Sequence, residues 1–254
     1  IAPVMERFSQ IKTVGVRFDD YPDNMTPYDE LKFYGGDLPT PEIDTDEIAC
    51  IFYTSGTTGF PKGAQLSHRN CITNLMAYIV SLRAGDVAIA RNNDAEEKLP
   101  AMGEGPVPHL LLTTPLFHVT ANNCAMQPTT MVGGKIVFMY KWDAGDALQI
   151  IEKEKITSIT GVPVMSREII NHPDFKKYDT SSITTLGGGG SAFQPDLIKD
   201  IDNALANGRP ATGYGLTEVS GMIAGISKDF SLMHPQSVGP PVVTMDVKIV
   251  NGQN

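Results

Sequence analysis

Apolar runs and turn-forming residues alternate along most of the chain. Residues 48–53 form a short apolar run, which predicts a buried strand. Apolar residues then recur at spacings of three and four after Ser67, so we expect a capped amphipathic helix over residues 68–82, followed by Gly85. Residues 91–108 are polar and rich in proline, and they predict an exposed insertion.

The second half of the chain alternates more regularly between strand and helix patterns. The expected strands are residues 110–114, 135–140, 156–160 and 183–186 and a short one near 211, after an earlier strand at 13–18. The expected helices are residues 143–154, 164–171 and 195–206. This alternation predicts an α/β fold with a mostly parallel sheet flanked by helices. Residues 242–250 alternate as an antiparallel strand does, so we expect part of a β-barrel-like subdomain at the C-terminal end.

Composition narrows the class of protein. The chain has 254 residues, of which 41% are hydrophobic, enough to bury a large core. A net charge of −9 argues against a nucleic-acid or anionic-membrane partner. Cys50, Cys71 and Cys124 match no zinc or disulfide pattern and favour a reducing cytoplasm. The longest apolar runs, such as residues 75–80, are too short to span a bilayer, so we expect a cytoplasmic protein without a transmembrane segment.

A loop rich in glycine and hydroxyl side chains follows the apolar run at residues 48–53. Its sequence is Tyr53-Thr-Ser-Gly-Thr-Thr-Gly-Phe-Pro-Lys-Gly63. The glycines permit tight turns with exposed N–H groups, the hydroxyls donate hydrogen bonds, and Lys62 adds a positive charge, which together favour phosphate. An ordinary polar turn remains the alternative. A Walker A loop is excluded, because Pro61 stands where the second glycine belongs and Gly63 follows Lys62.

Four further segments make the pattern specific. They are Pro115-Leu-Phe-His118, Gly161-Val-Pro163, the glycine-rich residues 186–193, and Tyr214-Gly-Leu-Thr-Glu218. Together with the loop, in this order, they resemble the adenylate-forming superfamily of acyl-CoA synthetases, peptide-synthetase adenylation domains and luciferases. The resemblance covers roughly residues 45–250. It implies that residues 1–240 are the α/β portion of the AMP-binding N-terminal domain and that residues 241–254 begin a β-subdomain.

The resemblance implies an ATP-dependent acyl-CoA synthetase. Such an enzyme couples a carboxylate to ATP, giving an acyl-adenylate and pyrophosphate, and then transfers the acyl group to the thiol of CoA, with Mg²⁺ as the metal. A fatty acid or related carboxylic acid is the expected substrate, because the residues near the expected pocket are small or apolar. The ribose-binding Asp and the C-terminal domain with its catalytic Lys do not appear, so we expect a fragment that is inactive alone.

The resemblance also implies roles for individual residues. The expected catalytic residues are Thr54, Lys62, His118, Thr217 and Glu218, with Glu218 as the Mg²⁺ ligand. The expected nucleotide-binding residues are Thr54, Ser55, Gly56, Thr57, Thr58, Gly59, Lys62, Gly188, Gly189, Gly190, Ser191, Gly213, Tyr214, Gly215, Leu216, Thr217 and Glu218. The expected acyl pocket comprises His118, Val119, Asn123, Gly161, Gly221 and Met222.

Each of these roles has a plainer alternative. Taken alone, Glu218 is expected to be a surface carboxylate, and His118 and Tyr214 are expected to be packed core residues. Residues 188–191 are then an ordinary strand-to-helix turn. At the level of function, the alternatives are an adenylation domain or acyl carrier ligase and a non-catalytic nucleotide-binding module. A hydrolase is disfavoured, because Gly189-Gly-Ser-Ala-Phe193 does not complete the nucleophile elbow G-x-S-x-G. The sequence does not encode the oligomeric state.

Overall fold

The computed structural model describes residues 6–7, 10–17, 19–22, 25–33, 35–37, 39–56, 59–94, 99–101 and 104–251. The chain forms two compact units, residues 1–43 and 44–254. In the first unit, β1 (Thr13–Gly15) pairs in parallel with β2 (Met25–Pro27), and the short helix α2 (Tyr28–Leu31) follows. The expected strand at residues 13–18 corresponds to β1 and is shorter. Every expected site residue belongs to the second unit.

The second unit begins with a β-hairpin. β3 (Ile48–Thr54) confirms the strand expected at residues 48–53, and it pairs antiparallel with β4 (Lys62–Ser67). The expected burial is wrong, because Ile48, Ile51 and Tyr53 are exposed in this two-stranded hairpin. The sequence did not predict β4, because in its six residues Leu66 is the one buried apolar side chain. Phe52, Leu66 and Cys71 form a small core under the hairpin.

The helix α3 (His68–Asn92) begins where the sequence predicted. The Ser67 hydroxyl accepts a hydrogen bond from the Asn70 N–H at 3.2 Å, and the Asn70 carboxamide oxygen accepts one from the Ser67 N–H at 3.0 Å. The two bonds satisfy N–H groups that a helix start leaves without partners. The expected end near residue 82 is wrong, because the helix continues through Gly85 to Asn92.

The length of α3 bears on membrane association. By length and composition alone, its 25 residues could cross a membrane, and no other described helix could. This is weak evidence, because helices of soluble proteins pass the same test. The expectation of no transmembrane segment assumed a shorter helix, and it stays a prediction.

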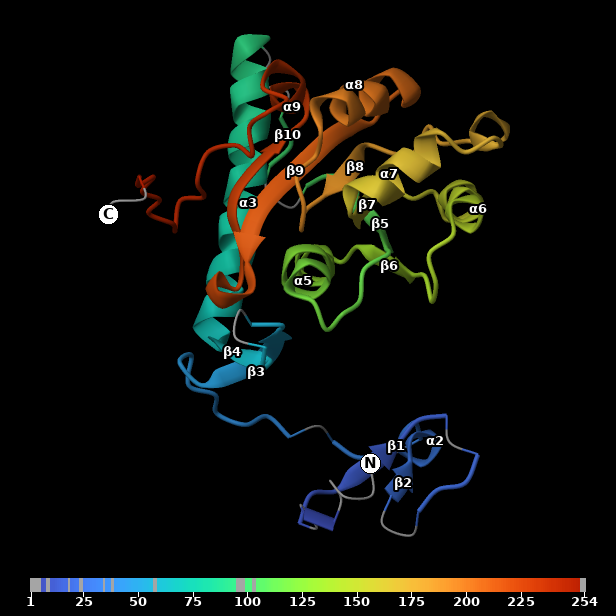
Figure 1. Cartoon of the computed structure of the whole chain (residues 1–254), viewed down its shortest axis with the longest axis vertical. Coiled ribbons are helices and arrows are strands. Elements are labelled where there is room, and N and C mark those ends of the chain that lie inside the picture. Colours follow the sequence, from blue (N-terminus) through green and yellow to red (C-terminus); the bar gives the residue numbers. More distant parts are fainter. Residues whose placement is uncertain are drawn as a thin grey trace. The chain divides into compact units, whose positions relative to one another are not determined.

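A six-stranded sheet forms the centre of the second unit, in the order β10-β9-β8-β7-β5-β6 (Figure 1). Its strands are β5 (His109–Leu112), β6 (Lys135–Phe138), β7 (Ser158–Gly161), β8 (Thr185–Gly188), β9 (Arg209–Leu216) and β10 (Gly221–Ser227). All neighbours are parallel except β9 and β10. The expected α/β class with a mostly parallel sheet is confirmed. The motif at residues 214–218, expected after a short strand, starts within the longer strand β9.

Helices cover both faces of this sheet, as the alternation of side chains along β5 shows. Leu111 packs in one core with α6 (Ala144–Glu154), α7 (Pro163–Ile170) and α8 (Pro195–Ala204). Leu110 and Leu112 pack on the other face, against a segment made of α4 (Val119–Ala121), η2 (Asn122–Met126) and α5 (Gln127–Met131). α3 runs along this second side, beside β10 and η2 (Figure 1). The shorter helical turns are η3 (Phe175–Lys177), η4 (Thr217–Val219) and α9 (Asp229–Met233).

The C-terminal segment differs from the sequence prediction. Residues 242–250 contain no strand, although their side chains alternate as expected of one. Val242 is buried and its N–H donates to the carbonyl oxygen of Ile223 at 2.8 Å, whereas Ile249 is 95% exposed. An alternating pattern forms a strand only when a partner strand lies beside it, and among the described residues none does. The division at residue 240 stays a prediction.

Candidate active site

A cavity of about 360 Å³ lies over β7, β8 and β9 and reaches the carboxyl ends of β8 and β9. The carboxyl edge is where ligands bind to open parallel sheets. The other lining residues come from α3, α4, η2 and both ends of β10. The lining residues that carry the argument are Tyr78, Leu82, His118, Val119, Cys124, Thr160, Gly188, Gly189, Gly190, Gly213, Tyr214, Gly215, Leu216, Thr217, Glu218, Gly221 and Met222. The cavity thus gathers some of the residues expected for nucleotide and some of those expected for the acyl group in one place.

The glycines at the strand ends have a structural reason. A Cβ on Gly188 would lie 1.7 Å from the carbonyl oxygen of Gly161 in β7, and one on Gly215 would lie 1.9 Å from the carbonyl oxygen of Gly221. Both positions therefore require glycine for the approach of neighbouring strands. Gly190 differs, because it has a φ of +82° and open space around it, as a turn facing a cavity requires. Ser191 is exposed and does not line the cavity.

Thr217 and Glu218 form a short 3-10 turn, η4, directly after β9. Both line the cavity, and the Glu218 side chain is exposed. Tyr214 lies on the same strand end with 49% of its surface exposed, so its ring is available to a ligand. The plain core-packing alternative for Tyr214 does not agree with this exposure. β4 of the hairpin packs beside η4.

The predicted phosphate loop is the turn of the β3–β4 hairpin. Thr54 and Lys62 are paired across the two strands, and the Thr54 hydroxyl donates to the Lys62 carbonyl oxygen at 3.4 Å. Gly56 has a φ of +65°, and a Cβ there would lie 2.5 Å from the carbonyl oxygen of Phe60, so the turn requires glycine. Ser55, Gly59 and Lys62 are exposed, whereas Thr57 and Thr58 lie outside the described residues. None of the described loop residues lines the cavity itself.

His118 lies at the cavity, where the chain enters α4. Its ring Nδ1 accepts a hydrogen bond from the Thr120 N–H at 3.2 Å, which caps the helix and fixes the ring. The side chain is exposed, so the alternative of a packed core histidine does not apply. Val119, the next residue, is buried and also lines the cavity.

The wall opposite the sheet contains residues of α3 that the sequence analysis missed. Tyr78, Ser81 and Leu82 of α3 face the cavity together with Cys124 of η2. The spacing of three and four residues along α3 puts the first three on one side of the helix, which was the available signal. Burial raises the pKa of the Tyr78 phenol to about 12 and that of the Cys124 thiol to about 11. Both groups therefore stay uncharged at neutral pH, and this wall is neutral.

Two residues expected in the acyl pocket have other surroundings. Gly161 is not among the lining residues, although its neighbour Thr160 is. Asn123 is fully buried, and its carboxamide nitrogen donates to Ser220 instead of facing the cavity. Gly221 and Met222 line the cavity, and their role in the acyl pocket stays a prediction.

The carboxylate that lines the cavity belongs to Glu218. Among the described residues, no group of three or more His, Cys, Asp or Glu side chains is arranged to hold a metal ion. This does not conflict with Mg²⁺, because that ion is commonly bound by one or two carboxylates together with substrate phosphates and water. An exposed carboxylate at the cavity therefore fits a metal that arrives with a nucleotide.

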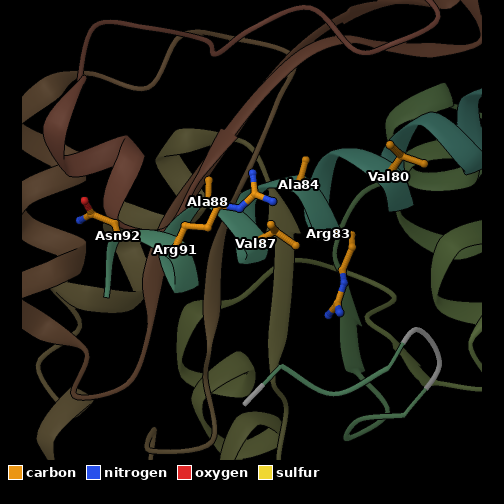
Figure 2. A pocket seen from close by; sticks show the side chains of 7 residues that line it. All are labelled: Val80, Arg83, Ala84, Val87, Ala88, Arg91 and Asn92. Atoms are coloured by element: carbon orange, nitrogen blue, oxygen red, sulfur yellow. The ribbon is translucent and has the colours of Figure 1, made fainter. Parts of the chain in front are cut away.

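A second hollow, of about 780 Å³, lies on the C-terminal half of α3 (Figure 2). Its lining residues are Val80, Arg83, Ala84, Val87, Ala88, Arg91 and Asn92. All of them belong to one helix, so the hollow is an open face and not an enclosed site. It contains no residue of the sequence motifs, and we therefore assign the candidate site to the smaller cavity.

The chain is similar to known proteins along nearly its whole length. The family model described as AMP-binding enzyme matches residues 4–254. Over 224 residues the chain is 30% identical to a feruloyl-CoA synthase of Amycolatopsis sp, covering 88% of this chain and 41% of that protein. It is 28% identical over 218 residues to a 4-coumarate–CoA ligase of Humulus lupulus, covering 85% and 37%.

A solved structure shares the fold. The o-succinylbenzoate CoA synthetase of Bacillus subtilis, in complex with ATP and magnesium ion, superimposes with a TM-score of 0.71 at 22% identity. The match covers 98% of this chain and 50% of that one. The chain spans about two fifths of the length of the two curated relatives named above.

Proposed function

We propose, from the premise that this chain belongs to the AMP-binding enzyme family, that the protein is an AMP-forming acid–CoA ligase. The observation that carries the proposal is the cavity at the ends of β8 and β9. It combines a glycine turn, an exposed tyrosine ring and the Thr217–Glu218 pair on one side with a neutral wall on the other. Such a cavity suits a nucleotide beside an uncharged acyl group.

The proposed reaction has two steps. A carboxylate oxygen of the acid attacks the α-phosphorus of ATP, and the bond to pyrophosphate breaks, giving an acyl-adenylate. The thiol sulfur of CoA then attacks the acyl carbon, and AMP leaves with the electron pair of the broken C–O bond while the thiol proton is released. The first step concentrates negative charge at the phosphates, so fixed donors and positive charge must surround them.

Residues of this chain meet these needs. Thr217 donates its hydroxyl to the α-phosphate, and Tyr214 flanks the adenine beside the turn at Gly189 and Gly190. Lys62 and the hairpin turn face the outer phosphates. Glu218 holds Mg²⁺, which when bound supplies positive charge to the phosphates and the departing pyrophosphate.

His118 lines the cavity, and in the proposed reaction it lies where the thiol reaches the acyl carbon. Its ring is fixed by the Thr120 N–H, which leaves the other ring nitrogen available to a ligand. This arrangement supports a role in orienting the acid or guiding the thiol. Asn123 and Gly161 were also expected to bind the acyl group. Their positions do not favour this role, because neither residue lines the cavity.

The acid carries no charge beyond its carboxylate and is either a fatty acid or an aryl-substituted acid. Tyr78, Leu82, Cys124 and Met222 form the part of the wall that supports this, because none of them carries a charge at neutral pH. The two curated relatives act, by their names, on feruloyl and 4-coumaroyl groups, which favours an aryl-substituted acid. We place the protein in the cytoplasm, in keeping with its unpaired thiols.

Nucleotide binding tests the metal-dependent part of this proposal. Calorimetric titration with ATP should show binding that Mg²⁺ tightens, and Glu218→Gln should remove most of the tightening. Glu104→Gln is the matched control, because Glu104 is an exposed carboxylate away from the cavity. ATP binding that responds neither to Mg²⁺ nor to Glu218→Gln would refute the role of Glu218.

The acceptor requires a separate comparison. Preformed acyl-adenylate, incubated with the full-length protein and either CoA or an acyl carrier protein, should give the thioester with CoA. Faster transfer to the carrier protein than to CoA would show that the protein instead loads a carrier.

A further inference from the structure

The turn that follows Glu218 has an unusual backbone. Ser220 has a φ of +68° and a ψ of +6°, in the left-handed region that non-glycine residues seldom adopt. The next residue, Gly221, has a φ of +139°. The pairing of β10 with β9 is irregular here, with a register shift between Met222 and Ala224. Strained backbone of this kind persists where surrounding groups hold it, and it gathers at functional sites.

Two buried side-chain amides hold this turn. The Asn123 carboxamide nitrogen donates to both the carbonyl oxygen and the hydroxyl of Ser220, each at 3.0 Å. The Asn74 carboxamide oxygen accepts from the Met222 N–H at 2.9 Å. Asn123 is 0% exposed and Asn74 is 3% exposed. The backbone on both sides of Gly221 is therefore fixed by side chains from other elements.

Asn74 is also joined to the backbone of Asn123. The Asn74 carboxamide nitrogen donates to the main-chain carbonyl oxygen of Asn123 at 3.1 Å. Asn74 thus donates one hydrogen bond and accepts another. An ionised carboxylate cannot donate, a hydrophobic side chain can do neither, and a hydroxyl is too short to reach both partners. A fully satisfied buried network of this kind makes a structure rigid, whereas a half-satisfied one is costly.

The network connects three segments of the candidate site. Asn74 lies on α3, the helix that directly follows the β3–β4 hairpin. Asn123 lies on the π-helix η2, five residues after His118. Ser220 lies two residues after Glu218 and its N–H donates to the Thr217 carbonyl oxygen at 3.1 Å. π-Helical turns occur frequently at functional sites, which agrees with this placement.

We propose that Asn74 and Asn123 are positioning residues that hold the Ser220–Met222 turn and thereby fix where Thr217 and Glu218 present their oxygens. Neither side chain needs to touch the substrates. The inference rests on the proposed function, because it concerns the metal-binding role assigned to Glu218. In other proteins, hydrogen-bond partners of metal ligands fix the orientation of those ligands. This network acts on Glu218 in the same way.

The test compares ATP dissociation constants with and without Mg²⁺ in Asn74→Ala and Asn123→Ala. Each variant should lose about 10-fold of the affinity gain that Mg²⁺ gives the wild-type protein, approaching Glu218→Gln. The affinity for AMP does not depend on a bound metal and should change by less than about threefold. Loss of a hydrogen-bond partner of a metal ligand typically has a larger effect, of about 10- to 100-fold. Thr129→Val is the control, because it deletes another buried hydrogen bond, from the Thr129 hydroxyl to the Ala125 carbonyl oxygen at 2.8 Å.

Hydrogen exchange gives a second, independent measurement. In folded Asn74→Ala, the Met222 amide should exchange faster than in Thr129→Val, while the amides of the core strand β5 should exchange alike in both variants. Equal Met222 exchange, or a fully retained Mg²⁺ gain in both asparagine variants, would overturn the inference and leave the proposed function standing. If the wild-type protein shows no Mg²⁺ gain, the proposed function fails and the inference fails with it.

Discussion

Gly188 of β8 and Gly161 of β7 are register partners in parallel strands, and a Cβ on Gly188 would lie 1.7 Å from the Gly161 carbonyl oxygen. The atom in the way belongs to the backbone, so no side-chain rotation can relieve the contact. The candidate nucleotide turn at residues 189–190 follows directly. Strand spacing and the shape of the cavity therefore depend on the same glycine.

Gly188→Ala should consequently separate β7 from β8. We expect a loss of about 3 kcal/mol in the free energy of unfolding, the upper range for overpacked cores, together with loss of ATP binding. Urea unfolding and calorimetry measure the two effects. Gly190→Ala is the control, since it has open space and should lose only about 1 kcal/mol from its left-handed backbone. Equal stability of the two variants would contradict the account.

Gly85→Ala should have the opposite sign. Gly85 lies within α3 and a Cβ there would meet nothing within 4 Å. Alanine in a helix interior is more favourable than glycine by about 1 kcal/mol, so the free energy of unfolding should rise by about that amount. If the helix instead ended at Gly85, as the sequence pattern suggested, alanine would lower the stability. Thermal or urea unfolding decides between the two.

Tyr214 should contribute to nucleotide affinity through its ring. Aromatic stacking on a base is worth about 1–3 kcal/mol by alanine substitution, so Tyr214→Ala should weaken ATP binding by about 10-fold or more. Tyr214→Phe keeps the ring and should bind nearly as wild type. The ring is half exposed, so both variants should unfold at similar denaturant concentrations. Equal ATP binding by the two variants would exclude stacking.

Stability should fall as the pH rises above about 9. Burial raises the pKa of Cys124 from 9.0 to about 11, so the unfolded chain loses its thiol proton first while the folded chain keeps it. The stabilisation is fully present below pH 9 and disappears as the pH approaches 11. In this window the Cys124 thiol should contribute a slope of about 1 kcal/mol per pH unit.

Urea unfolding of the reduced protein at a series of pH values measures this slope. Cys124→Ala should be less stable at every pH, because it leaves a small cavity, but its stability should fall less steeply above pH 9. An identical slope in the variant and the wild type would show that Cys124 does not titrate as described.

The sequence predicted those features whose causes are local. The helix at residues 143–154 was expected because Asp143 precedes a run of helical spacing, and the structure has Asp143 as the cap, accepting from the Asp146 N–H at 2.9 Å. The five motifs likewise marked the ends of β8 and β9 and the segment after β5. Local pattern was sufficient for these elements.

Features that depend on distant partners were not predicted. The bond between Asn74 and Met222 joins residues 148 positions apart, and nothing near Asn74 in the sequence indicates it. β4 forms because β3 is beside it, whereas residues 242–250 have a strand pattern and no described partner. Asn123 was assigned to the acyl pocket from its place after His118, but its direction depends on the π-helical turn η2.

Acid-dependent exchange of labelled pyrophosphate into ATP tests the central claim most directly. Label enters ATP when the acyl-adenylate reacts backwards with labelled pyrophosphate, so the exchange reports formation of that intermediate. The assay uses the full-length protein, because we expect the present chain to be inactive alone. It needs Mg²⁺ and a panel of fatty acids and aryl-substituted acids, including ferulic and 4-coumaric acid. We predict exchange that requires one class of acid and that Glu218→Gln abolishes. No exchange with any acid, in a protein that still binds ATP, would contradict the assignment as an adenylate-forming ligase.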